Sequence, residues 1–252
     1  MTEQNTQQQE QYNILLIGDD CIDVYQYGTV DRISPEAPVP VFKFSYEERK
    51  PGMAGNVARN LEALGCRVNY LHSNTSIKTR LVDIRSKQQI VRIDNDIVSQ
   101  PLEFETAIPK VYDAIVISDY DKGTVSYNII QEAIATGIPV FVDTKKTDLE
   151  LMQGAWVKIN ELEYSKIKSE CTGLIVTLGR KGARVPHHEL EFAAPEVEVA
   201  DVTGAGDTFL AALVSEYLTQ KDIKAAIPYA IRAASITVQH SGVYAPTWEE
   251  LE

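Results

Sequence analysis

The heptapeptide Asp201–Asp207 (Asp-Val-Thr-Gly-Ala-Gly-Asp) constrains the fold of this chain more than any other stretch. The following run, 208–214, is apolar with helical spacing, so Gly204 to Asp207 are predicted to form a helix N-terminus. Glycines there let a ligand approach the backbone, and the unpaired N–H groups favour an anion. A simple helix cap would explain Thr203 or Asp207, but not two glycines around an alanine between two aspartates.

The carboxylate of Asp207 is expected to lie beside any anion that docks at this helix N-terminus. It repels a resting phosphate, but it can accept a proton from a hydroxyl that attacks one. An anion hole next to a base is suited to phosphoryl transfer. We therefore expect Asp207 to act as the general base, with the backbone N–H groups of Gly204, Ala205 and Gly206 as the anion hole.

Composition narrows the class of protein further. The 252 residues, 44% of them hydrophobic, indicate one ordinary globular domain. A net charge of -12 argues against a nucleic-acid or anionic-membrane partner. No apolar run is long enough to span a bilayer and no signal pattern is present, so a cytoplasmic protein is expected. The three cysteines, Cys21, Cys66 and Cys171, lack metal-site spacing and are expected to be reduced thiols.

Short apolar runs alternate with helical segments along the chain, which predicts an α/β fold with a mostly parallel sheet. Residues 1–11 are polar and expected to be a disordered tail, and residues 12–252 one domain. The predicted strands are 13–17, 68–72, 114–118, 139–142 and a run beginning at Leu174. A loop over residues 51–58 is predicted to open a helix that ends at Gly65. Further helices are predicted over 125–136, from near Gly204, and over 223–239.

Two stretches interrupt this alternation with strand-like patterns. Residues 24–46 are rich in tyrosine and proline, and the alternation over 39–44 predicts a strand, with Pro40 indicating an edge. Residues 77–95 contain two further strand patterns that are expected to form a hairpin turning near Ser86. Because an isolated two-stranded sheet is marginal in water, we expect both stretches to join in one small sheet.

The heptapeptide resembles the signature of the ribokinase-like (PfkB) carbohydrate kinases. Further segments resemble one subgroup, the D-glycero-D-manno-heptose 7-phosphate kinases, which are often fused to an adenylyltransferase. These segments are Gly18-Asp19, Asp23, Tyr25, Tyr27-Gly28 and Arg32–Val41. The resemblance implies a three-layer αβα sandwich with a small β-sheet lid that covers the sugar and often mediates a homodimer. It also implies ATP and Mg²⁺ as cofactors.

The resemblance assigns roles residue by residue. In that family the last aspartate of the signature, here Asp207, is the base. The sugar would be held by Asp19, Asp23, Gly52 and Asn56. Lys122 in Asp-Tyr-x-Lys-Gly and Lys145 in Asp-Thr-Lys are candidate ligands for a substrate phosphate. Asn160 and Glu163 fit the family's Asn-x-x-Glu, which helps to place Mg²⁺ through water. The residues expected to border the nucleotide are Thr177, Gly179, Thr203 and Gly242.

The chain also departs from the family pattern. Met53 stands where a second glycine is usual, and Ile231 stands where an asparagine helps to cover adenine. Segments usual in the family after His72 and after Tyr164 are missing, so a shortened fold is expected. The expected reaction is phosphorylation of heptose 7-phosphate, with adenylyl transfer left to another protein. Two alternatives stay open: a kinase of another sugar or a nucleoside, and a catalytically silent sugar- or nucleotide-binding protein.

Overall fold

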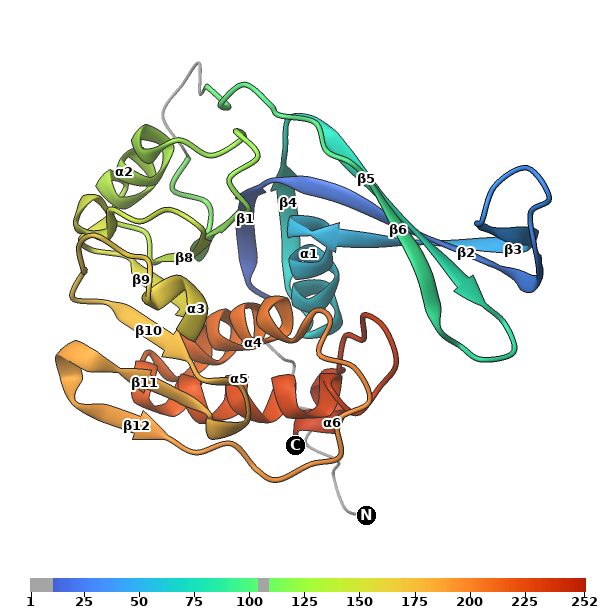
Figure 1. The fold of residues 1–252 in the computed structure, drawn as a ribbon. Coiled ribbons are helices and arrows are strands. Elements are labelled where there is room, and N and C mark those ends of the chain that lie inside the picture. The colour runs from blue at the N-terminus through green and yellow to red at the C-terminus, as the bar shows by residue number, and fades with distance from the viewer. Residues whose placement is uncertain (1–10, 104–108) are drawn as a thin grey trace, which may run out of the picture.

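The computed structural model describes residues 11–103 and 109–252. Within these residues the strands form one sheet of eight strands and another of four (Figure 1). The larger sheet contains β1 (Asn13–Gly18), β4 (Arg67–Leu71), β7 (Ala114–Asp119), β8 (Val140–Thr144), β9 (Trp156–Asn160), β10 (Leu174–Thr177), β11 (Ala183–Val185) and β12 (Leu190–Phe192). Its order is β12-β11-β10-β9-β8-β7-β1-β4. The strands from β4 to β10 pair in parallel, and β11 and β12 pair antiparallel at the edge.

Helices cover both faces of the larger sheet. The helices of the described residues are α1 (Ala54–Ala63), α2 (Tyr127–Ala135), α3 (Glu161–Tyr164), α4 (Ala205–Gln220), α5 (Ile223–Thr237) and α6 (Trp248–Leu251), with short 3-10 turns η1 (Leu149–Met152), η2 (Gly179–Lys181) and η3 (Pro186–His188). Ile14 and Leu16 of β1 pack with α1, α4 and α5 in one core. Leu15 and Ile17 pack with α2 and η1 in the other. Because alternate residues of a strand point to opposite faces, β1 needs apolar residues throughout, and the predicted αβα sandwich is confirmed.

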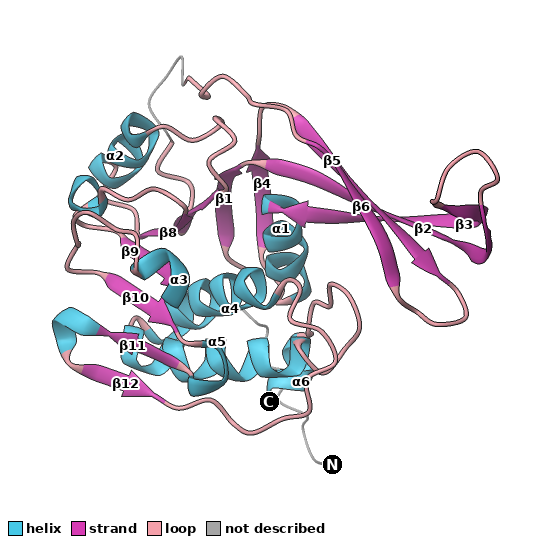
Figure 2. Ribbon diagram, in the orientation of Figure 1, coloured by secondary structure: helices cyan, strands magenta, loops and turns pink. Residues whose placement is uncertain are grey.

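The smaller sheet contains β2 (Asp20–Ile33), β3 (Pro40–Met53), β5 (Thr75–Asp83) and β6 (Gln89–Asn95) in the order β3-β2-β5-β6. The two strand-rich stretches thus join directly, through the parallel pairing of β2 with β5. Figure 2 shows this sheet extending away from the larger one. Pro40 begins an edge strand, as expected, where its missing N–H removes no interior ladder bond. The role of the sheet as a lid stays a prediction.

Some boundaries differ from those expected. Residues 51–53 end β3 rather than forming a loop, and α1 follows at once. Helix α2 starts at Tyr127, two residues later than expected, because the Ser126 hydroxyl accepts a hydrogen bond from the N–H of Ile129 and caps the helix there.

The shortening expected after β4 is present in the fold. Only residues 72–74 connect β4 to β5, without a helix or strand between them. The tail expected at residues 1–11 lies outside the described residues except for Gln11. In the ranges 11–103 and 109–252, no helix is long and apolar enough to cross a membrane.

Candidate active site

Helix α4 begins where the sequence predicted, with Gly204 as its N-cap residue. Gly204 has a φ of 80°, a backbone conformation that favours glycine. A Cβ atom added to Gly204 would lie 2.8 Å from Nδ2 of Asn56, and one added to Gly206 would lie 2.9 Å from Nζ of Lys158. Both glycines therefore let neighbouring side chains approach the start of the helix, where the N–H groups and the helix dipole favour an anion.

Asp207 lies in the first turn of α4 and is only 6% exposed. Its Oδ2 accepts a hydrogen bond of 2.7 Å from Nδ2 of Asn56, and its Oδ1 accepts one of 2.9 Å from the hydroxyl of Tyr120. Burial raises the pKa of Asp207 to about 6, although both hydrogen bonds oppose the rise. A carboxylate with a pKa of about 6 is mostly ionised at neutral pH. Because this pKa lies close to neutral pH, the carboxylate can also accept a proton efficiently.

A buried polar network holds Asn56 in place. Asn60 donates from Nδ2 to the backbone carbonyl of Asn56 at 2.7 Å, and Thr208 donates to Oδ1 of Asn60 at 2.8 Å. The hydroxyl of Thr237 donates to that of Thr208 at 3.0 Å. Asn56 and Asp207 are thus fixed against each other by α1, α4 and α5. The expected contact of Asn56 with the sugar stays a prediction.

Lys158 is a functional candidate that sequence reasoning missed. It lies on β9, is 5% exposed, and its Nζ is 2.6 Å from Oδ2 of Asp143 at the end of β8. Burial lowers the pKa of Lys158, but the ion pair with Asp143 and the attraction of Asp207 outweigh it, so the pKa lies above its usual value. The lysine is therefore a buried cation against Gly206. The available signal was a charged residue inside an apolar strand run.

Asp19 lies at the carboxyl end of β1 and is 1% exposed. Its Oδ2 accepts hydrogen bonds from the N–H groups of Tyr120 at 2.8 Å and Lys122 at 3.0 Å. Its Oδ1 accepts one from the N–H of Thr124 at 3.1 Å. The carboxylate thus organises the loop after β7, and its expected contact with the sugar stays a prediction. Satisfying turn N–H groups is a common role of aspartate.

Asp23 and Gly52 lie side by side where the small sheet meets the larger one. They face each other closely, since a Cβ atom on Gly52 would lie 2.5 Å from Oδ2 of Asp23. Asp23 also forms a nearly buried ion pair with Arg80 of β5. Met53, which follows Gly52, has φ 50° and ψ -131°, a conformation that glycine adopts far more readily. The family glycine is therefore absent, but the backbone keeps a glycine-like shape.

Both lysines expected to bind a substrate phosphate are in ion pairs. Nζ of Lys122 lies 2.6 Å from Oδ2 of Asp96, and Lys145 pairs with Glu163. Each pair would have to open, or share its cation, before a phosphate could bind. Their phosphate-binding role stays a prediction.

Asn160 and Glu163 form a capping box at the start of α3. The N–H of Glu163 donates to Oδ1 of Asn160 and the N–H of Asn160 donates to Oε2 of Glu163, both at 2.8 Å. No group of three or more His, Cys, Asp or Glu residues in the described part of the chain could hold a metal ion. Mg²⁺ usually keeps several waters and binds substrate phosphates. The expected role of these two residues in placing Mg²⁺ through water stays a prediction.

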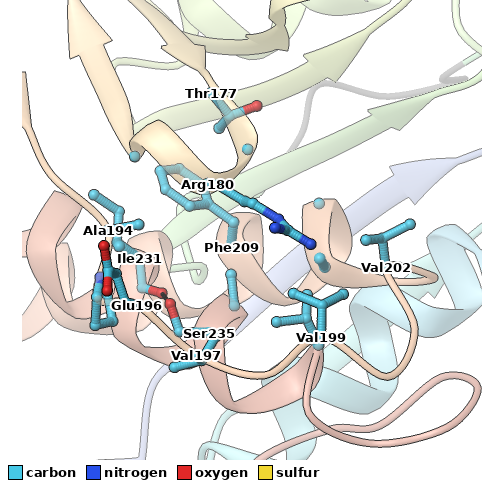
Figure 3. A pocket seen from close by; sticks show the side chains of 17 residues that line it. Thr177, Arg180, Ala194, Glu196, Val197, Val199, Val202, Phe209, Ile231 and Ser235 are labelled. Atoms are coloured by element: carbon cyan, nitrogen blue, oxygen red, sulfur yellow. Dashed lines mark hydrogen bonds between the residues drawn. The ribbon is translucent and has the colours of Figure 1, made fainter.

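A cavity of about 590 Å³ adjoins the start of α4. Thr177 and Gly179 line it, as do Ala205 and Gly206, and Ile231 of α5 forms part of its wall (Figure 3). Its further lining residues are Arg180, Gly182, Ala194, Pro195, Glu196, Val197, Val199, Val202, Phe209, Ala234, Ser235 and Val238. The volume and the mostly apolar lining are typical of a small-molecule site.

Thr203 and Gly242 do not line this cavity, but the backbone N–H groups of both residues donate hydrogen bonds to the carboxylate of Asp201. Oδ1 of Asp201 accepts a hydrogen bond of 2.9 Å from the N–H of Thr203, and Oδ2 accepts one of 2.9 Å from the N–H of Gly242. The first aspartate of the heptapeptide thus connects the α4 entry with the loop after α5. Their expected contact with the nucleotide stays a prediction.

Curated relatives match almost the whole chain. The bifunctional protein HldE of a Nitratiruptor species is 36% identical over 300 residues, covering 95% of this chain and 64% of the relative. HldE of Pseudomonas putida (strain GB-1) is 32% identical over 301 residues, covering 96% of this chain and 63% of the relative. The chain thus spans less than two thirds of the length of these relatives. Because the alignments exceed 252 residues, the relatives carry residues that have no counterpart here.

Solved structures share the fold. Ribokinase from Thermotoga maritima has a TM-score of 0.71 at 18% identity, covering 95% of this chain and 98% of its own. Phosphofructokinase-2 from Escherichia coli, in complex with potassium, has a TM-score of 0.72 at 15% identity, covering 95% and 96%. The expected ribokinase-like fold is therefore confirmed.

A family model of the pfkB carbohydrate kinases matches residues 119–250, which include the heptapeptide, Lys158 and the walls of the cavity. Because this model covers more than half of the chain, the protein belongs to the pfkB family of carbohydrate kinases, phosphotransferases that use an alcohol group as acceptor.

Proposed function

We propose that the protein transfers the γ-phosphoryl group of ATP to the anomeric hydroxyl of heptose 7-phosphate, which gives heptose 1,7-bisphosphate. The kinase chemistry follows from the family, and the choice of heptose 7-phosphate as the substrate rests on two further observations. These are the resemblance of Arg32–Val41 to the heptose 7-phosphate kinases and the similarity to HldE proteins.

The observation that carries the proposal is the buried carboxylate of Asp207 in the first turn of α4. The acceptor hydroxyl donates its proton to this carboxylate as its oxygen attacks the γ-phosphorus, and the bond from that phosphorus to the ADP oxygen breaks. The backbone N–H groups of Gly204, Ala205 and Gly206 and the ammonium of Lys158 favour the negative charge on the phosphoryl group.

The cavity beside α4 is the proposed site of ATP. Thr177 and Gly179, which line the cavity, are proposed to border the nucleotide, and Ile231 of α5 forms part of the same wall. Thr203 and Gly242 complete the border through their shared hydrogen bonds to Asp201. Asn160 and Glu163 would hold Mg²⁺ through water, and the bound ion would neutralise charge on the phosphates.

The sugar is proposed to lie where the small sheet meets the larger one. The candidates for its hydroxyl groups are Asp19, Asp23, Gly52 and Asn56. Lys122 and Lys145 are candidates for the phosphate, each charge-assisted contact contributing about 1.5–3 kcal/mol. Two such contacts would make the affinity for the phosphorylated sugar roughly 10²–10⁴-fold higher than the affinity for the free sugar.

A comparison of kcat/KM for heptose 7-phosphate, free heptose, fructose and ribose tests this assignment. We expect heptose 7-phosphate to be used far better than the rest. Equal or better use of an unphosphorylated sugar would exclude the heptose phosphate while leaving the kinase assignment intact. A kinase of another sugar has an observation in its favour, because Lys122 and Lys145 are already paired with Asp96 and Glu163. If the protein bound nucleotide but turned over none of these sugars, a catalytically silent binding protein would be favoured instead. The strained backbone of Met53 would then be one reason for the loss of activity.

The small sheet is proposed to act as a lid and to form a homodimer interface. Phe44 on β3 is 58% exposed and Ile93 on β6 is 54% exposed, which is unusual for such large apolar side chains on long strands. Sedimentation velocity would distinguish a dimer from a monomer. The phosphoryl transfer is proposed to occur in the cytoplasm.

A further inference from the structure

We propose that Tyr120 is a positioning residue that holds the carboxylate of Asp207, through an O–H···Oδ1 hydrogen bond, in the orientation and charge state that accept the proton of the acceptor. The inference rests on the proposed role of Asp207 as the base. It adds a residue that the sequence resemblance leaves without a role.

The contact itself is well formed. The hydroxyl of Tyr120 lies 2.9 Å from Oδ1 of Asp207, and Asn56 donates to the other oxygen at 2.7 Å. Each carboxylate oxygen can accept two hydrogen bonds, so the pair of donors fixes the carboxylate plane and leaves capacity for the substrate hydroxyl. Burial and the nearby Asp207 raise the pKa of Tyr120 well above its usual value, so the phenol keeps its proton and acts as a donor.

Tyr120 is held from two sides. Its N–H donates to the buried carboxylate of Asp19 at 2.8 Å, and the N–H groups of Lys122 and Thr124 bind the same carboxylate. The ammonium of Lys145 lies 5.2 Å from the centre of the Tyr120 ring. The backbone and the ring are thus both restrained, which a side chain that orients a reacting group requires.

Charged groups reach Asp207 from several elements. Lys158 on β9 favours its ionised form and Asp143 on β8 opposes it, while burial opposes it most. Glu163 on α3 raises the pKa of Tyr120 and of Lys158, the two groups next to Asp207. In this balance the Tyr120 hydrogen bond favours the carboxylate, so its removal should raise the pKa of the base.

The experiment compares the pH profiles of kcat and kcat/KM for the full chain and for Tyr120→Phe. A base must be ionised to act, so activity falls as pH drops through its pKa. We expect Tyr120→Phe to move this acid limb upward by about one to two pH units, to recover much of its kcat at alkaline pH, and to leave KM for ATP nearly unchanged. Tyr112→Phe is the matched control, because the Tyr112 hydroxyl accepts a hydrogen bond from Asn69 outside this site.

If the Tyr120→Phe substitution disturbs folding, a second variant still tests the inference. Fluorotyrosine at position 120 is a stronger donor of similar size, so it should move the acid limb in the opposite direction, to lower pH. An unchanged pH profile in both variants would overturn the inference, as would an equal loss of kcat at every pH. Full turnover of Asp207→Asn would instead overturn the proposed base itself, so the two failures are distinguishable.

Discussion

Replacing Asp207 with asparagine should make the protein more stable at neutral pH while it removes most of the turnover. The carboxylate is 6% exposed, and its pKa is raised from 3.8 to about 6. At 1.36 kcal/mol per unit, this difference of about two units means that the ionised carboxylate costs the folded state roughly 3 kcal/mol.

The sign of the pH dependence follows from proton binding. The folded protein holds the Asp207 proton more tightly than the unfolded chain does, so the stability contributed by this group is lost as pH rises from about 3.8 to about 6. Asparagine has the shape of the protonated carboxyl group and does not titrate. The variant should therefore match the natural chain near pH 4 and exceed its unfolding free energy by roughly 2–3 kcal/mol near pH 8.

Urea unfolding of both proteins at about pH 4 and about pH 8 measures the effect as a change in midpoint at constant slope. Steady-state kinetics of the same samples should give a kcat lower by roughly 10²–10⁴-fold, with nucleotide binding retained. A gain in stability that does not depend on pH, or no gain at all near pH 8, would refute the reasoning that burial of this charge strains the folded state.

The other predictions concern Lys158 and Met53. Lys158→Met should lower the unfolding free energy by about 3–5 kcal/mol, because it leaves the carboxylate of Asp143 buried and unpaired. The double variant Lys158→Met/Asp143→Asn should recover the unfolding free energy measured in urea, but not the rate of phosphoryl transfer in a single turnover. Recovery of both would show that the role of Lys158 is purely structural. Met53→Gly should be more stable than Met53→Ala by about 1–2 kcal/mol, because only glycine relaxes φ 50° and ψ -131°. Equal thermal stability of those two variants would show that the Met53 backbone is unstrained.

The sequence by itself determined much of the fold, because its patterns depend on neighbours along the chain. The apolar run at β1 predicts a strand buried on both faces, and Ile14 and Leu15 indeed enter different cores. The glycines of the heptapeptide predict the α4 entry, and the alternation over residues 77–95 predicts the β5–β6 hairpin. Each of these signals is a local backbone preference or a periodicity of side chains.

The ends of helices and strands were predicted less accurately, because they depend on contacts with residues outside the local sequence pattern. Proline and glycine at positions 51 and 52 indicate a loop, yet pairing with β2 keeps these residues in β3. Tertiary pairing here outweighs the local preference.

The tertiary structure alone decided how the site is connected. Tyr120 and Asp207 are 87 positions apart, and Asn56 and Asp207 are 151 apart, so no spacing rule relates them. Lys158 looks like an isolated charge in a strand until β8 brings Asp143 beside it. Charge balance, burial and hydrogen bonding of a group depend on which elements pack against it, and packing is a property of the whole fold rather than of any segment.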